Sequence, residues 1–96
     1  MLTIEDIKKT VAEIAPKYNL KKVTLFGSRA RGNFREDSDV DLIVDFPKNT
    51  GLLKHVMLQQ ELEDIFGLTV DVISRGGIKG SLIENEIEKE IEIYAA

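Results

Sequence analysis

Two aspartates one residue apart are the side chains in this sequence best suited to metal chemistry. Asp39 and Asp41 stand at the start of a largely apolar segment, residues 39–46. Because successive side chains of a β-strand point to opposite faces, both carboxylates are expected on one face, about 7 Å apart. Carboxylates that close repel each other unless a positive charge lies between them. Mg²⁺ prefers oxygen ligands and is usually held by one or two carboxylates together with substrate phosphates. The pair is therefore predicted to bind a divalent cation.

A third aspartate, Asp71, belongs to another apolar, β-branched segment, residues 68–74. If the apolar faces of both predicted strands meet one layer of helices, Asp71 shares a face with Asp39 and Asp41. Three convergent carboxylates suit two-metal nucleotidyl transfer, in which one ion activates the attacking hydroxyl and the other neutralises the triphosphate. An isolated Asp-x-Asp is more often a solvated strand end or a turn, and here the Gly-Ser turn together with Asp71 favours a metal site instead. Asp45, about 13 Å from Asp41 along the strand, is assigned to the surface or to helix capping.

The turn before the acidic pair has the residue types of a phosphate site. Gly27 and Ser28 follow a predicted strand, residues 22–26. Glycine lets the backbone approach a phosphate closely, and amides at the start of a helix can donate to an anion. The Ser28 hydroxyl could add a bond to a β- or γ-phosphate oxygen, although an ordinary turn with a serine cap has the same sequence. Arg29 is the candidate triphosphate ligand of this turn, whereas Arg31 could instead pair with nearby acids.

Composition predicts a small soluble protein. The chain has 96 residues, a net charge of −4 and no cysteine, which favours a single domain over residues 1–96 without disulfides. The acidic balance argues against broad binding to nucleic acid. The first residues do not resemble a signal peptide, and no apolar run approaches the length needed to span a membrane. A cytoplasmic location is therefore expected.

Hydrophobic periodicity predicts the elements that must position these residues. Helices are expected at residues 4–17, begun by the capping pair Thr3 and Asp6, at 52–66, and at 81–94. The second of these is expected to bury Leu53, Val56, Met57, Gln60 and Ile65, and the third is predicted because isoleucines 83, 87 and 91 repeat every four residues.

The order of these elements indicates an α/β (α+β) fold. It predicts a small mixed sheet of about three strands, covered by helices mainly on one face. The uncovered face is expected to be the working one. The single histidine, His55, lies inside a predicted helix without partners at metal-ligand spacing, and a structural role is expected for it.

Two stretches carry a family resemblance. The segments Phe26-Gly-Ser-Arg-Ala-Arg-Gly32 and Asp37-Ser-Asp-Val-Asp-Leu42, followed by Asp71 on a later strand, resemble the minimal nucleotidyltransferase (MNT) branch of the DNA polymerase β superfamily. The resemblance covers nearly the whole chain. It implies a nucleotidyltransferase fold like the polymerase β palm.

The resemblance also implies an activity. It implies transfer of AMP from ATP to a hydroxyl, with Asp39 and Asp41 holding two Mg²⁺ ions and Asp71 completing one metal site as the base near the acceptor. Short MNT proteins are often antitoxins encoded beside a HEPN-domain toxin, which several are thought to silence by attaching AMP to a tyrosine. ATP and a HEPN toxin are thus the expected partners, and direct contact with nucleic acid or membrane is not expected.

Two alternatives remain open at this stage. An MNT fold could neutralise its partner by occlusion without catalysis, or it could modify a small molecule such as an antibiotic. The complete set of aspartates favours catalysis over occlusion, because clustered carboxylates give a pure binding protein no obvious advantage. Base selectivity and the acceptor are expected to depend on loops or on a partner protein.

Overall fold

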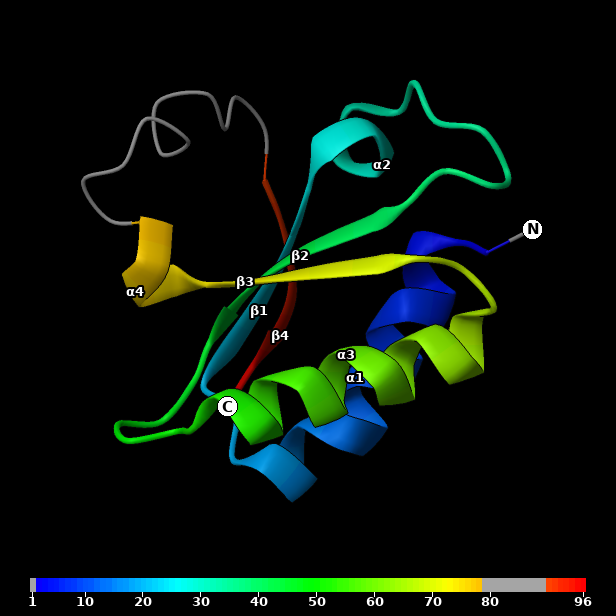
Figure 1. The fold of residues 1–96 in the computed structure, drawn as a ribbon. Helices are drawn as coiled ribbons and strands as arrows, with labels where there is room; N and C mark the ends of the chain where they lie inside the picture. The colour runs from blue at the N-terminus through cyan, green and yellow to red at the C-terminus, as the bar shows by residue number, and fades with distance from the viewer. Residues whose placement is uncertain (1, 79–89) are drawn as a thin grey trace.

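Four strands form one mixed sheet in the computed structural model, which describes residues 2–78 and 90–96. The spatial order is β3-β2-β1-β4 (Figure 1). Strand β1 (Lys22–Phe26) lies antiparallel to both β2 (Val40–Asp45) and β4 (Ile91–Ala95). Strand β2 pairs in parallel with β3 (Val70–Ser74). Because β2 and β3 are parallel, they begin at the same end of the sheet, and a helix connects them.

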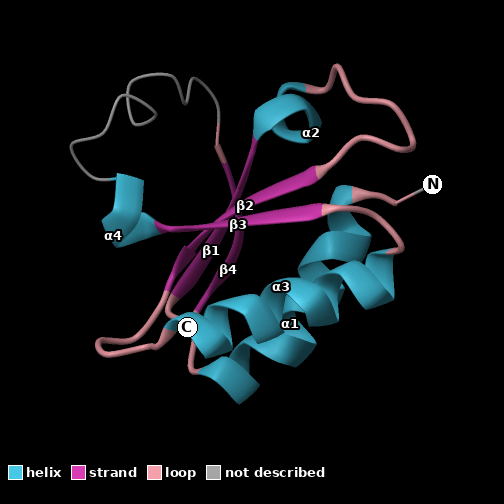
Figure 2. Cartoon of the chain, viewed as in Figure 1, coloured by secondary structure: helices cyan, strands magenta, loops and turns pink. Residues whose placement is uncertain are grey.

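Two long helices cover one face of this sheet. Helices α1 (Ile4–Tyr18) and α3 (Leu52–Phe66) lie side by side below the strands (Figures 1 and 2). The short helices α2 (Gly27–Arg31) and α4 (Arg75–Ile78) follow β1 and β3. The core between the sheet and the long helices includes Ile7, Val11, Leu25, Leu42, Val44, Leu58 and Leu62. We call the other side, which carries Thr24, Asp41 and Asp71, the open face.

Local signals in the sequence fix the ends of several elements. A capping box between Thr3 and Asp6 begins α1, and Asn19 ends it in the left-handed conformation with φ of 55°. Gly32 ends α2 with φ of 84°, and Gly67 ends α3. The start of α1 and both ends of α3 agree with the predicted helices at residues 4–17 and 52–66, and α1 extends one residue further than predicted. None of the helices in the described part of the chain is long and apolar enough to cross a membrane.

The end of the chain corrects the prediction that the last helix extends to residue 94, and that of a three-stranded sheet. Residues 91–95 form strand β4, while 81–89 lie outside the described residues. Pairing with β1 supplies partners for backbone groups that would otherwise form an open sheet edge. It also buries Ile93, which is 7% exposed. These tertiary contacts outweigh the four-residue isoleucine spacing that predicted a helix.

The orientation of α3 also differs from the prediction. Its buried side chains are Leu58 and Leu62, each 1% exposed. The residues expected to face the core are instead exposed: Leu53, Val56, Met57, Gln60 and Ile65. The helix begins after Gly51 without a side-chain cap, because the Thr50 hydroxyl donates to the Pro47 carbonyl instead.

His55 has the structural surroundings that were expected for it. Its Nε2 lies 2.8 Å from the Val72 carbonyl oxygen, and its ring stacks on Phe46 with 5.1 Å between centroids. These contacts fasten α3 to the end of β2 and to β3.

Candidate active site

Asp41 and Asp71 lie side by side at the start of the parallel strands. They are register partners of β2 and β3, and their side chains are close enough for Asp71 to raise the pKa of Asp41. Burial raises the pKa of Asp41 from 3.8 to about 6, with further contributions from the hydrogen bond and charge of Asp71 and from the charge of Asp39. Two carboxylates in contact are costly to ionise together without a cation. A bound cation would therefore stabilise this carboxylate pair.

Asp39 lies next to the carboxylate pair rather than within it. It precedes β2, is exposed, and its negative charge helps to raise the pKa of Asp41. Among the residues that the structure describes, no three acidic or histidine side chains already converge around one point as a formed metal site. The donors nevertheless fit a hard divalent cation, because carboxylate oxygens are its preferred ligands.

The Gly-Ser turn lies directly against Asp41. Phe26 is the register partner of Asp41, so the next residue, Gly27, passes beside its carboxylate. The φ of Gly27 is +76°, and a Cβ built there would collide with the Asp41 Oδ2 atom. A glycine is thus required both by the backbone conformation and by the contact. The turn places Ser28, which is half-buried, next to the acidic residues.

The two arginines of α2 have different surroundings. Arg29 is only 3% exposed, and its Nη2 donates to the Ser38 carbonyl oxygen at 2.9 Å. This geometry does not favour the contact with triphosphate that the sequence suggested for Arg29. Arg31 is exposed, and its charge lowers the pKa of Asp41. Arg31 shares a helix face with Ser28 because the two are three residues apart, a spacing that favours it over Arg29.

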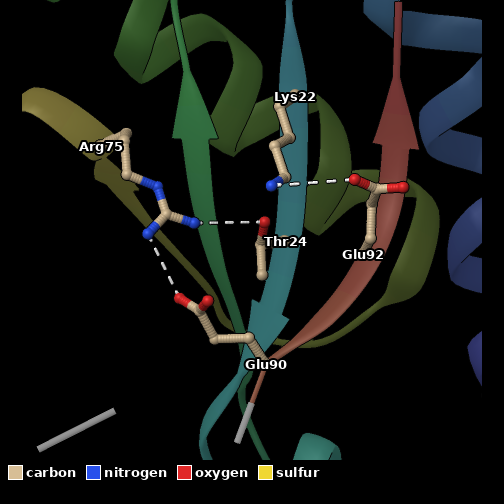
Figure 3. A network of polar contacts seen from close by, with 5 residues as sticks. All are labelled: Lys22, Thr24, Arg75, Glu90 and Glu92. Carbon is tan, nitrogen blue, oxygen red and sulfur yellow. Dashed lines mark hydrogen bonds and ion pairs between the residues drawn. The ribbon is translucent and has the colours of Figure 1, made fainter.

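A polar network lies on the open face near these residues (Figure 3). Arg75 Nη2 donates to the Thr24 hydroxyl at 3.3 Å, and its Nη1 contacts Glu90 Oε1 at 3.2 Å. Lys22 and Glu92 form a longer ion pair at 3.7 Å. The Arg75–Glu90 contact joins the end of β3 to the start of β4, the two edge strands of the sheet. The sequence carries no local signal for this link, because its residues are distant along the chain.

A mixed sheet with helices on one face, and a Gly-Ser turn against paired carboxylates on the other, is the arrangement of a nucleotidyltransferase. The chain belongs to the nucleotidyltransferase domain family, whose model matches residues 4–94. A protein adenylyltransferase, MntA of Thermococcus cleftensis, is 32% identical over 97 residues, covering 97% of this chain and 98% of the relative. MJ0128 of Methanocaldococcus jannaschii is 35% identical over 95 residues, covering 95% and 97%.

Solved structures share the fold. A minimal nucleotidyltransferase structure is 31% identical with a TM-score of 0.73, covering 94% of this chain and 95% of that chain. A toxin–antitoxin complex with AMP-PNP has a TM-score of 0.74 at 17% identity, covering 93% and 73%. A complex of tri-AMPylated Shewanella oneidensis HEPN toxin with its MNT antitoxin has a TM-score of 0.71 at 14% identity, covering 98% and 74%. The predicted family, fold and enzyme class are therefore confirmed.

Proposed function

We propose that this nucleotidyltransferase uses Mg²⁺ to transfer AMP from ATP to a tyrosine hydroxyl of a partner HEPN toxin, and thereby acts as its antitoxin. The similarity to the MntA adenylyltransferase supports the reaction class. The shared fold with antitoxins in toxin complexes, one with a nucleotide analogue and one with an AMPylated toxin, supports the nucleotide and the partner.

The observation that carries this proposal is the contact of Asp41 with both Asp71 and Gly27. It supports a site in which Asp39, Asp41 and Asp71 hold cations beside a turn that receives phosphates. When bound, Mg²⁺ would lower the pKa of the acceptor hydroxyl and neutralise charge on the triphosphate.

Each residue then has a defined task in the transfer. The acceptor oxygen bonds to the α-phosphorus while the bond from that phosphorus to the β-phosphate bridging oxygen breaks, releasing pyrophosphate. Asp71 takes the proton of the acceptor hydroxyl. Gly27 and Ser28 orient the phosphates through backbone and hydroxyl groups, and Arg31 offsets charge on the leaving pyrophosphate.

The surface of α3 supports a protein as the acceptor. All five of the large apolar side chains that are exposed within the described residues lie on this helix: Leu52, Leu53, Val56, Met57 and Ile65. Contiguous exposed apolar surface is typical of protein–protein contact. Leu53, Val56 and Met57 form one stripe because they are three and four residues apart. A small-molecule substrate gives no reason for this stripe.

Labelled ATP tests the proposal. The wild-type protein, Asp41→Asn and the control Asp45→Asn are each incubated with α-labelled ATP, Mg²⁺ and the toxin partner. We expect label on the partner with wild type and Asp45→Asn, and none with Asp41→Asn. Mapping the label to a tyrosine would establish the acceptor.

Neutralisation by occlusion is the second candidate, and the exposed stripe on α3 is the observation that favours it. If Asp41→Asn still inhibits the toxin fully without transferring label, occlusion explains the antitoxin activity. If the partner is neither labelled nor inhibited, the proposed function is wrong.

A further inference from the structure

Arg29 is a buried cation that contacts carbonyl oxygens instead of an acid. Its Nε and Nη2 both donate to the Ser38 carbonyl, at 3.2 and 2.9 Å, and Nη2 also contacts the Glu36 carbonyl at 3.2 Å. Nη1 reaches the Leu2 carbonyl at 3.4 Å. The guanidinium carbon lies 4.8 Å from the centre of the Phe34 ring. None of the ion pairs within the described residues involves Arg29.

These contacts act on the segment that carries Asp39. The residue before Asp39 is Ser38, whose carbonyl Arg29 holds. The residue after it is Val40, whose amide donates to the Thr69 carbonyl at 2.9 Å where the parallel strand pairing begins. Asp39 therefore stands between two fixed points of the backbone. Its exposed side chain needs no contact of its own to be held near Asp41.

We propose that Arg29 is a positioning residue, which sets the affinity of the site for a divalent cation by fixing the backbone on which the Asp39 carboxylate stands. The inference rests on the proposed metal-dependent function. It assigns to Arg29 a task that is distinct from contact with ATP.

The chemistry of the guanidinium explains why an arginine occupies this position. Its planar fork directs five N–H donors at fixed angles, so that one side chain can bind three carbonyl groups in two separate segments. It stays charged when buried, and its flat face packs on an aromatic ring. A lysine has a single ammonium group, which could retain the contact with the Ser38 carbonyl but could not also reach the carbonyls of Leu2 and Glu36.

Binding of Mn²⁺, followed by electron paramagnetic resonance in the absence of ATP, tests this role. Wild type is compared with Arg29→Met, Arg29→Lys and a control, Arg35→Met, which removes an exposed arginine from the loop that follows α2. Loss of a residue that orients a metal ligand typically weakens metal binding about 10–100-fold. We expect weakening of about tenfold or more in Arg29→Met, partial recovery in Arg29→Lys and no change in Arg35→Met.

Two further measurements separate positioning from direct phosphate contact and from general destabilisation. At saturating Mg²⁺ the KM for ATP should change less than about threefold in Arg29→Lys, whereas the Mg²⁺ concentration for half-maximal rate should rise. Hydrogen exchange in Arg29→Lys should accelerate at residues 33–39 and stay unchanged in α1 and α3. Arg29→Lys is decisive if Arg29→Met does not fold.

Several outcomes would overturn the inference. Unchanged Mn²⁺ affinity in a folded Arg29→Met or Arg29→Lys variant would do so, as would an increase confined to the KM for ATP. Failure of the wild type itself to bind Mn²⁺ would instead remove the metal-dependent function on which the inference rests.

Discussion

The backbone of Gly27 lies against the carboxylate of Asp41, with no space between them for a side chain. Gly27, at the turn after β1, therefore has to be a glycine because Asp41, on β2, occupies the space that a side chain would need. This contact makes the Gly-Ser turn and the aspartates one structural unit, and it leads directly to a test.

Gly27→Ala should damage the site, whereas Gly32→Ala should affect stability alone. Both glycines have positive φ, so each substitution should cost about 1–2 kcal/mol in backbone strain. Only the new Cβ at position 27 meets another group, the Asp41 carboxylate; nothing lies within 4 Å at position 32. We expect a further loss of stability and at least tenfold lower transfer in Gly27→Ala, measured by chemical unfolding and with labelled ATP. Equal activity in the two variants would contradict the packing argument.

Replacing Asp39 or Asp41 by asparagine should abolish transfer without unfolding the protein. Neither carboxylate has a cationic partner within ion-pair distance among the described residues, and each is repelled by the other acids of the site. The melting temperature of Asp41→Asn, measured without metal at about pH 7.5, should therefore equal or exceed that of wild type. A large decrease would show that these aspartates serve the fold rather than the chemistry.

The stability of the metal-free protein should depend on pH through Asp41. Its pKa is raised from 3.8 to about 6 on folding, so the folded state binds more protons than the unfolded state between these values. The free energy of unfolding should therefore fall as pH rises from about 4 to 7. A shift of about two pH units corresponds to about 3 kcal/mol, and solvent screening at this partly exposed site reduces the expected effect to about 1–2 kcal/mol.

The difference between wild type and Asp41→Asn isolates this effect, because other carboxyl groups have the opposite influence. The pKa values of Asp6 and Glu61 are lowered by hydrogen bonds, from Thr3 and Lys17 respectively, and both variants retain these bonds. Urea unfolding of both proteins at several pH values measures the difference. A constant difference across the range would show that Asp41 does not titrate as described.

Substituting the α3 stripe should weaken binding of the proposed toxin partner and leave folding intact. Leu53 is 72% exposed and Met57 is 46% exposed, so replacing both by glutamine should alter the free energy of unfolding by less than about 0.5 kcal/mol each. If the toxin packs on them, its affinity should fall about tenfold or more, as measured by calorimetry. Glu13→Gln, on the exposed face of α1, is the control. Unchanged toxin affinity together with altered self-association would assign the stripe to a second copy of this chain.

Short-range patterns in the sequence were sufficient for much of this architecture. The apolar segments 39–46 and 68–74 predicted strands that the structure has at 40–45 and 70–74. They also predicted the shared face of Asp41 and Asp71, because side-chain direction in a strand follows residue parity. The capping pair Thr3 and Asp6 marked the start of α1, since their side chains satisfy backbone groups at that end. These features depend on residues only a few positions apart.

Tertiary structure alone decided the features that depend on distant partners. Residues 91–95 became a strand because β1 offered them an unpaired edge, which no local pattern can reveal. Packing on the sheet buries Leu58 and Leu62 of α3 and leaves its apolar residues Leu53, Val56 and Met57 exposed, contrary to the side that the sequence predicted. The sequence suggested Arg29 as a ligand of triphosphate, yet folding brings the carbonyl groups of Leu2 and Ser38 to its guanidinium. Residue types thus determined which chemistry was possible, and contacts between separate segments determined which residues were placed to perform it.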